Sequence, residues 1–256
     1  MDFQGKVIII TGGGSGMGKA TAIELVKLGA NVVINGRREQ VLLDAAAEID
    51  PTGEHVITVV GDIRNPETSA RIMEETINTF SGIDVLIVSS GIFKPTPFLD
   101  HSEADFNSYM DTIVKGTFFI AQAVIPEMIK RGGGAIVSVG SMWATQAIGA
   151  TPSSAYSAAM AGRHALTRNL AIEFAKDHIR INTVAPAVVE TPVYNSFIPQ
   201  DQMRSVLDSF NTFHPLGRIG QPKDMVSAIL FLASEEASWI TGALLPVDGG
   251  VTAGRH

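Results

Sequence analysis

The chain alternates short, β-branched apolar runs with longer amphipathic segments along almost its whole length. Seven apolar runs are predicted as strands, at residues 7–10, 31–34, 56–60, 85–88, 135–139, 180–184 and 243–247. Helices are predicted mainly between them, at residues 18–28, 39–49, 67–80, 102–130, 155–176 and 223–233. Strands that alternate with helices are joined by crossovers, and nearly all-apolar strands are covered on both faces. We therefore predict an α/β fold built on a Rossmann-like, doubly wound parallel sheet of seven strands.

The sequence favours a single domain that spans residues 1–256, because no linker, low-complexity tract or internal repeat interrupts it. A chain of 256 residues is long enough to bury one large core. The rhythm changes only after Pro186, where an irregular stretch follows. Long irregular loops often cover substrate sites, so residues 187–216 are predicted to form a substrate lid.

The charge balance excludes several classes of partner. Asp plus Glu number 26 and Lys plus Arg 19, a net charge of −7, which is unfavourable for binding nucleic acid or an anionic membrane. Without cysteine there is no thiolate nucleophile or disulfide, and no metal site is expected. The apolar runs are too short or too interrupted for a signal peptide or a membrane span. These features predict a cytoplasmic protein that binds a small molecule.

A glycine cluster, Gly12-Gly13-Gly14-Ser15-Gly16-Met17-Gly18, lies between the first predicted strand and the first predicted helix. Glycine lacks the Cβ that would keep a pyrophosphate away from the free N–H groups at the positive end of a helix. A tight turn alone would also be rich in glycine. The position of the cluster in an alternating chain nevertheless favours a dinucleotide site.

The end of the second strand bears on the choice of cofactor. Dinucleotide folds that prefer NAD carry a carboxylate there for the ribose 2′-hydroxyl, whereas this chain has Arg37 and Arg38, with no carboxylate before Glu39. Two arginines favour a 2′-phosphate, so NADP(H) is predicted and NAD(H) is the alternative. Solvated residues that open the next helix would also explain both arginines.

Along essentially its whole length, the chain resembles the short-chain dehydrogenase/reductase family. Thr11, Gly12, Gly16 and Gly18 fit the family motif T-G-x-x-x-G-x-G, and Gly61-Asp62-Ile63 resembles its adenine contact. Residues 186–191 resemble the segment that holds the nicotinamide carboxamide, and residues 240–242 with 247–250 resemble the usual ending. The resemblance implies cofactor contacts at Gly12, Ser15, Gly16, Met17, Gly18, Arg37, Asp62, Ile63, Gly91, Tyr156, Val189 and Thr191.

The resemblance also implies a catalytic pair. The family uses a Tyr as general acid/base and a Ser that orients the substrate carbonyl, and Tyr156 and Ser141 fit these positions. The family's Lys, four residues after the Tyr, lowers the pKa of the Tyr and holds the nicotinamide ribose. Here that position is Met160, and the position of the family's relay Asn is Ile113.

Two further motifs depart from the family pattern. Its N-N-A-G and P-G appear as Val88-Ser89-Ser90-Gly91 and Pro186-Ala187. Four departures around one site make natural divergence a more economical account of Met160 than a deliberate substitution.

Three nearby cationic or titratable residues are candidate substitutes for the missing lysine. Lys115 is close only to the Asn position, and Arg163 and His164 lie two helical turns after Tyr156, ~10 Å along the axis. All three are predicted to be ordinary charges on a helix surface, and none is assigned to the site.

Three apolar or aromatic segments, residues 93–98, 142–143 and 193–213, predict a hydrophobic or cyclic substrate, although helix packing or subunit contact would explain the same residues. The first hypothesis is an NADP(H)-dependent oxidoreductase that interconverts a ketone and its secondary alcohol, weakened by the loss of the lysine. The second is a nucleotide-binding family member without redox chemistry, serving as a sensor, a partner subunit or a redirected enzyme. The resemblance further implies a homo-oligomer, most commonly a tetramer.

Overall fold

The computed structural model describes residues 1–149 and 151–254. Seven parallel strands form one sheet in the order β3-β2-β1-β4-β5-β6-β7. The strands are β1 (Val7–Thr11), β2 (Asn31–Gly36), β3 (Val56–Val60), β4 (Val85–Val88), β5 (Gly134–Val139), β6 (Ile179–Pro186) and β7 (Leu244–Val247). The predicted Rossmann-like, seven-stranded sheet in a single domain is confirmed.

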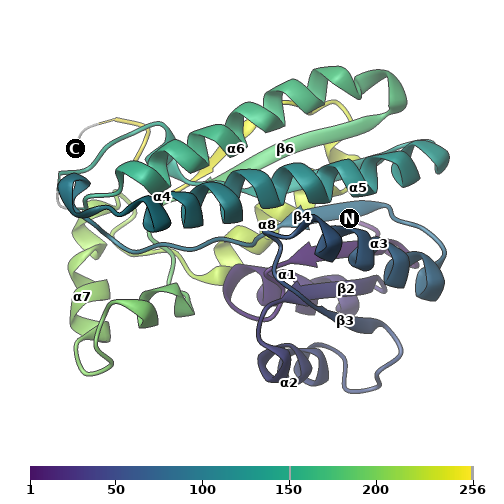
Figure 1. Ribbon diagram of the computed structural model, residues 1–256, viewed down its shortest axis with the longest axis horizontal. Coiled ribbons are helices and arrows are strands. Elements are labelled where there is room, and N and C mark those ends of the chain that lie inside the picture. The colour runs from purple at the N-terminus through teal and green to yellow at the C-terminus, as the bar shows by residue number, and fades with distance from the viewer. Residues whose placement is uncertain (150, 255–256) are drawn as a thin grey trace.

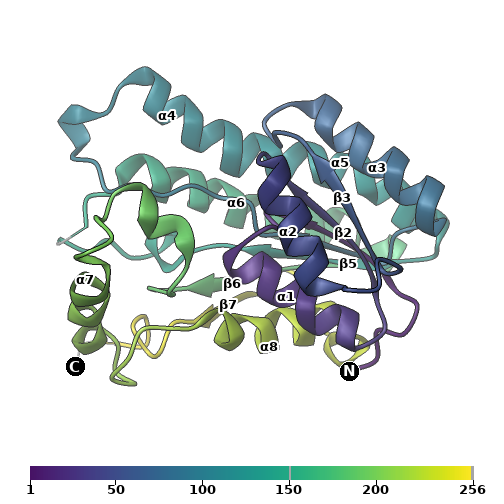
Figure 2. The ribbon, with the colours of Figure 1, turned by 90° about the horizontal axis from the view of Figure 1, so that it is seen from below.

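Helices cover both faces of the sheet (Figure 2). They are α1 (Gly16–Lys27), α2 (Glu39–Ile49), α3 (Pro66–Phe80), α4 (Glu103–Tyr109), α5 (Gly116–Lys130), α6 (Ser154–Glu173), α7 (Met203–Ser209) and α8 (Pro222–Ala233). One apolar cluster joins the sheet to α1, α2 and α8, and a second joins it to α3, α5 and α6. Successive β1 residues divide between the two: Ile8 and Ile10 belong to the first cluster and Ile9 to the second. This alternation explains why the strand is apolar at every position.

The predicted helix 102–130 is continuous in direction but not in hydrogen bonding. In Figure 1, α4 and α5 lie end to end as one long rod. Between them, Met110–Lys115 is π-helical, a local widening that periodicity alone does not predict. Glu103–Lys130 is long and apolar enough by composition to cross a membrane, but half of its most apolar 18-residue window is buried inside the fold. Packing in the core accounts for this apolar character.

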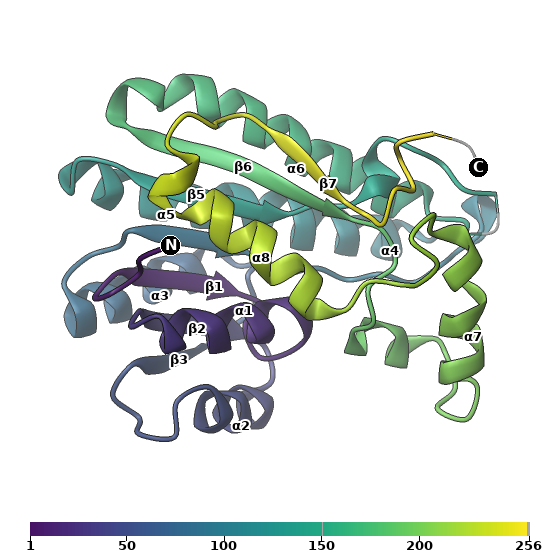
Figure 3. The same cartoon turned by 180° about the vertical axis from the view of Figure 1, so that it is seen from behind.

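The strand order reverses between β1 and β4. The strands after β1 are added toward one edge of the sheet, and the strands after β4 toward the other. In such a sheet the helices that follow the two central strands diverge, and a crevice opens at the carboxyl ends of the strands. In Figure 3, α4, α7 and the C-terminal segment gather beyond those ends. The fold thus places the predicted glycine turn, the residues after β4 and the residues after β5 around one crevice.

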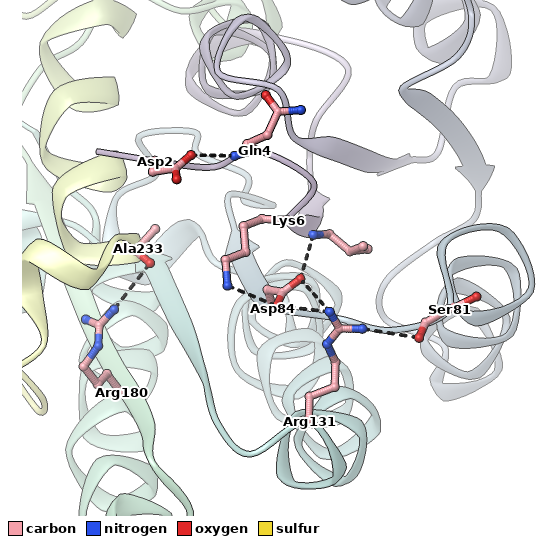
Figure 4. A network of polar contacts seen from close by, with 9 residues as sticks. Asp2, Gln4, Lys6, Ser81, Asp84, Arg131, Arg180 and Ala233 are labelled. Atoms are coloured by element: carbon pink, nitrogen blue, oxygen red, sulfur yellow. Dashed lines mark hydrogen bonds and ion pairs between the residues drawn. The ribbon is translucent and has the colours of Figure 1, made fainter.

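A polar network around Asp84 lies at the amino ends of the central strands, opposite the crevice (Figure 4). The Asp84 carboxylate accepts a hydrogen bond from the backbone N–H of Val7 at 2.8 Å and pairs with Lys6 and Arg131 at 3.6 and 3.4 Å. Arg131 also donates to the carbonyl oxygen of Ser81 at 3.3 Å. One carboxylate therefore links the start of β1, the start of β4 and the end of α5, away from the crevice.

Candidate active site

Two adjoining cavities occupy the crevice, with volumes of about 690 and 160 Å³. They share Ser15, Arg37 and Gly91 among their lining residues. Of the positions predicted from the sequence, the larger cavity is also lined by Gly16, Met17, Ser141, Tyr156, Val189 and Thr191, and the smaller by Gly12, Asp62 and Ile63. Segments far apart in the sequence thus meet at one site.

The glycine turn is shaped by backbone contacts that exclude larger residues. Gly12 has φ +71°, and a Cβ there would lie 2.8 Å from the backbone nitrogen of Ser90. A Cβ at Gly18 would lie 2.4 Å from the carbonyl oxygen of Gly12. Gly18 is absent from the cavity lining within the described part of the chain, and its contact is with the turn itself. In this motif, Gly12 and Gly16 therefore border the cavities, whereas Gly18 allows the turn to close.

The start of α1 suits a phosphate group. Its N-cap residue, Ser15, makes no side-chain cap, and the first turn carries no acidic residue. The first N–H groups of a helix lack intrahelical partners and lie at the positive end of its dipole. Exposed Arg37 and Arg38 line the same cavity after β2. These residues fit a dinucleotide whose phosphates carry several negative charges.

Asp62, the predicted adenine contact, has its carboxylate engaged within the chain. It accepts hydrogen bonds from Arg64, at 3.0 Å from the backbone nitrogen and 2.6 Å from Nη2. The side-chain hydrogen bonds from Arg64 are the largest influence and hold the pKa of the Asp62 carboxyl below its usual range, although burial opposes them. The positive charge of Arg37 acts in the same direction as Arg64. Asp62 is therefore a fixed anion in the wall of the smaller cavity.

Ser141 and Tyr156 reach the larger cavity from different elements. Ser141 is buried just after β5, where its hydroxyl accepts a hydrogen bond from the backbone N–H of Trp143 at 3.2 Å. Tyr156 lies in the first turn of α6. Burial raises the pKa of the Tyr156 phenol, and hydrogen bonding to Ser141 and the positive charge of Arg163 act in the opposite direction. The nearby Tyr109 adds to the upward shift.

The two departures at the site are apolar in the structure as well as in the sequence. Met160 is buried and lines the cavity one turn after Tyr156. Ile113 is fully buried in the π-helical segment, in a cluster with Tyr109, Ala159 and Met160. A thioether is a weak acceptor and an alkyl chain is neither donor nor acceptor, so neither side chain can replace an ammonium or an amide.

The prediction that Arg163 and His164 lie on the helix surface is wrong. Arg163 is 1% exposed, and His164 is also buried. Helical side chains lean toward the N-terminus of the helix, so a long side chain two turns after Tyr156 reaches back toward it. Lys115 is exposed as predicted and pairs with Asp111 at 3.9 Å.

The Arg163 guanidinium is bound by the backbone of three neighbouring segments. Nη1 donates to the carbonyl oxygen of Val139 at 2.7 Å and Nη2 to that of Ser90 at 2.8 Å. Nε donates to the Thr117 hydroxyl at 3.0 Å and more weakly to the carbonyl oxygen of Ile113 at 3.4 Å. Sequence reasoning missed this residue. The available signal was a lone arginine among small and apolar residues, on the same helix face as Tyr156.

His164 supports Ser141 from behind. Its Nε2 accepts a hydrogen bond from the Ser141 backbone N–H at 3.3 Å, and a Cβ at Gly140 would lie 2.2 Å from that nitrogen. Burial, with the positive charges of Arg163 and Arg168, lowers the pKa of His164 to about 4. The imidazole is thus neutral near pH 7, as an acceptor nitrogen requires.

Aromatic rings wall the larger cavity. Phe93 contacts Tyr156 edge to face with a centroid separation of 4.8 Å, and Phe197 at 5.7 Å. Tyr109 lies 6.2 Å from Tyr156, and its hydroxyl donates to the carbonyl oxygen of Lys94 at 2.9 Å. The sequence alone does not single out Tyr109, because its place in the wall depends on how α4 packs against α6 and no local motif marks it.

The predicted lid segment contributes both lining and packing residues. Val193 and Tyr194 line the cavity. A second group lies behind the wall in an apolar cluster with Met142 and Trp143, and consists of Met203, Leu207, Phe210 and Phe213. The buried indole N–H of Trp143, a cavity-lining residue, has no hydrogen-bond partner in the portion of the chain that the structure describes.

Comparisons with known proteins agree with this geometry. A sequence profile of the family described as enoyl-(acyl carrier protein) reductase matches residues 12–252. The (2S)-[(R)-hydroxy(phenyl)methyl]succinyl-CoA dehydrogenase subunit BbsD of Thauera aromatica is 35% identical over 250 residues, covering 98% of each chain. Cis-4-hydroxycyclohexanecarboxylate dehydrogenase of Sinomonas cyclohexanicum is 35% identical over 252 residues, also covering 98% of each. The crystal structure of levodione reductase has a TM-score of 0.91 at 30% identity, and the match covers 99% of this chain and 100% of that one.

The lowered pKa of His164 predicts that acid weakens the fold. The unfolded imidazole binds a proton near pH 6.5 and the folded one near pH 4, so this stabilisation is complete above about pH 6.5 and is lost as pH falls toward 4. Between pH 7 and pH 5 the free energy of unfolding should drop by roughly 2 kcal/mol from this group. Urea denaturation of the unmodified protein and of His164→Gln, which keeps an acceptor, isolates the effect. Equal pH dependence in the two proteins would contradict it.

Proposed function

The chain belongs to the short-chain dehydrogenase/reductase family, and we propose that it is an NADP(H)-dependent oxidoreductase that interconverts a hydrophobic or cyclic ketone and its secondary alcohol. Family membership makes the chain an oxidoreductase that uses a nicotinamide dinucleotide and a small-molecule substrate. The observation that carries the finer proposal is the convergence of Ser141 and Tyr156 on an aromatic-walled cavity that continues to the glycine turn and Arg37.

The preference for NADP(H) rests on the residues after β2. Arg37 and Arg38 line both cavities, and the segment from Asn35 to Arg38 contains no carboxylate that would accept from a ribose 2′-hydroxyl. A guanidinium can meet a phosphate through two charge-assisted hydrogen bonds. NAD(H) is the alternative cofactor.

The residues of the site divide the chemistry between them. When bound, the nicotinamide supplies or accepts a hydride. We assign its carboxamide to the backbone of Val189 and the hydroxyl of Thr191. The Ser141 hydroxyl donates a hydrogen bond to the substrate oxygen, and the Tyr156 phenol gives that oxygen a proton in reduction and takes it back in oxidation. The rings of Phe93, Tyr109 and Trp143 line the same cavity, and we propose that they limit the access of water to these two hydroxyls.

Met160 is proposed to weaken this chemistry. Tyrosine has an unperturbed pKa of about 10, and burial raises the pKa of Tyr156. A cation within ~4–6 Å would favour the phenolate, but the side chain one turn along the helix is a thioether. The proton is thus harder to remove near neutral pH than in a family member with lysine at this position.

The aromatic wall supports a hydrophobic or cyclic substrate. Two similar proteins carry names that point the same way: one is a cis-4-hydroxycyclohexanecarboxylate dehydrogenase and one a levodione reductase. The proposed lid, residues 187–216, adds Tyr194 and Val193 to this wall. We propose that the chain acts in the cytoplasm.

A second candidate function is nucleotide binding without redox chemistry, as a sensor, partner subunit or redirected enzyme. The apolar residues Met160 and Ile113 favour it, and the retention of Ser141 and Tyr156 opposes it. Fluorescence titration with NADPH and NADH, followed by a panel of ketones assayed for loss of NADPH absorbance, separates the two. Turnover supports the oxidoreductase, whereas tight binding with no turnover on any ketone supports the alternative.

Arg37→Ala is expected to weaken NADPH binding selectively. The loss of charge-assisted hydrogen bonds to a phosphate is worth about 1.5–3 kcal/mol, so the dissociation constant for NADPH should rise roughly 10- to 100-fold. The constant for NADH should hardly change. Lys27→Ala, which removes an exposed charge of α1 paired with Glu24, is the matched control. Equal loss for both cofactors would show that Arg37 does not contact a 2′-phosphate.

The chain is expected to form a homotetramer through an isologous contact that includes α8 and the edge strand β7. We further predict that the C-terminal tail, residues 251–256, lies near a neighbouring subunit; of these residues, Arg255 and His256 lie outside the described part of the chain. Sedimentation velocity at micromolar concentration checks the assembly. A single monomeric species would contradict this prediction.

Met160→Lys is expected to raise kcat/KM for both directions by the same factor at a fixed pH, because no residue changes the overall equilibrium. The added cation favours the Tyr156 phenolate, so the alkaline limb of alcohol oxidation should move toward neutral pH. Met160→Leu, which keeps the site apolar, is the control. Turnover by the unmodified protein at about 1–10³ s⁻¹ with a neutral optimum would contradict the proposed impairment.

A further inference from the structure

Arg163 carries a positive charge that no carboxylate neutralises among residues 1–149 and 151–254. Its recorded hydrogen bonds go to the carbonyl oxygens of Ile113, Val139 and Ser90 and to the hydroxyl of Thr117, all of which are uncharged acceptors. No ion pair of the described chain includes it. A buried charge is costly unless it is paired. An anion that forms in the adjoining cavity would therefore be stabilised by this cation.

The phenol of Tyr156 can become that anion, and Tyr156 lines the same cavity as Arg163. Both residues line the larger cavity, and both belong to α6, seven residues apart. The side chain of Arg163 is anchored to Ser90, which lines the same cavity. Met160 lies between them along the helix and is packed in an apolar cluster that also borders Tyr156. Because such surroundings screen charge poorly, the guanidinium acts on the phenol more strongly than it would through water.

We propose that Arg163 is a positioning residue that stabilises the phenolate of Tyr156 and so supplies, from beyond Met160, part of the positive charge that the family's lysine supplies. The inference rests on the proposed acid/base role of Tyr156, but it concerns a property that Tyr156 has without any substrate. The side chain does not replace the lysine's contact with a ribose, so the compensation is electrostatic and partial.

Among the described residues that line the cavity, Arg163 is the one buried cation. Burial lowers the pKa of the adjacent His164 to about 4, so this imidazole is neutral near pH 7. Tyr109 and Tyr194 also face the phenol, and burial raises the pKa of each. The charged groups Lys94, Asp105, Arg37 and Arg38 line the cavity at exposed positions, where solvent screens them. Burial lowers the pKa of Arg163 to about 10, so it is charged throughout the neutral range.

Ionisation of the three tyrosines tests the proposal without any turnover. Tyrosine labelled with ¹³C at the ζ carbon reports each phenol by NMR during a pH titration, and Tyr→Phe variants assign the three signals. Arg163→Gln, which keeps two N–H donors but no charge, should raise the pKa of Tyr156 by about one unit or more. Arg163→Lys, which keeps the charge, should leave it within a few tenths of a unit. The pKa values of Tyr109 and Tyr194 should change less than that of Tyr156.

The outcomes separate an electrostatic role from a purely structural one. An Arg163→Gln protein with native circular dichroism and an unchanged Tyr156 pKa would overturn the proposal. If that variant does not fold, citrulline incorporated at position 163 gives the answer, because it keeps the length of the side chain and its N–H donors but is neutral. It should raise the pKa of Tyr156 as is expected of Arg163→Gln, and an unchanged pKa would overturn the proposal. These titrations measure the pKa of Tyr156 without any substrate, so they test the role of Arg163 even if the protein reduces no ketone. Failure of the proposed redox function would therefore be a separate result.

Kinetics of the two positions together provide a second readout. If Arg163 already supplies part of the charge, Met160→Lys should raise kcat/KM by a larger factor in the Arg163→Gln background than in the unmodified one. Equal factors in both backgrounds would mean that the two positions do not share a role, and would count against the proposal.

Discussion

The buried guanidinium of Arg163 is the interaction on which the shape of the crevice depends. Its donors fix the carbonyl oxygens of Ser90 and Val139, which follow or end two neighbouring strands, and reach Thr117 and Ile113 on the long helical rod. Burying so polar a group is favourable only when its donors are satisfied. The guanidinium therefore links the ends of β4 and β5 and the start of α5 to α6, and the segments that carry the hydroxyls of Ser141 and Tyr156 share this anchor.

The sequence predicted the fold well because its information is local and periodic. The strands are apolar at successive positions because their side chains alternate between two cores. In β1, for example, Ile8 packs in one core and Ile9 in the other. The glycine turn was predictable because backbone contacts at Gly12 forbid a Cβ. The burial of Arg163 does not follow from its spacing, because a distance along the helix axis ignores the length of this side chain and its lean toward the helix N-terminus.

The two halves of the site differ in how far a sequence can predict them. The cofactor half is made by a backbone turn and a helix start, and such features leave marks at fixed spacing. The proposed substrate half is walled by Phe93, Tyr109, Tyr156 and Phe197, which come from separate elements and meet only after folding. Tyr109 in particular enters the wall from α4, and no motif marks it. Packing rather than pattern determines this half.

The π-helical segment Met110–Lys115 sets the rotational phase of α4 relative to α5. A π turn holds one residue more than the α-helical turn it replaces, and each residue advances an α-helix by about 100°. Removing a single residue there would leave α5 in its place and turn α4 about its axis, carrying the Tyr109 ring away from Tyr156. The length of this helix is thus coupled to the outline of the cavity. Insertions and deletions here would change what fits the cavity, while the sheet beneath would be unaffected.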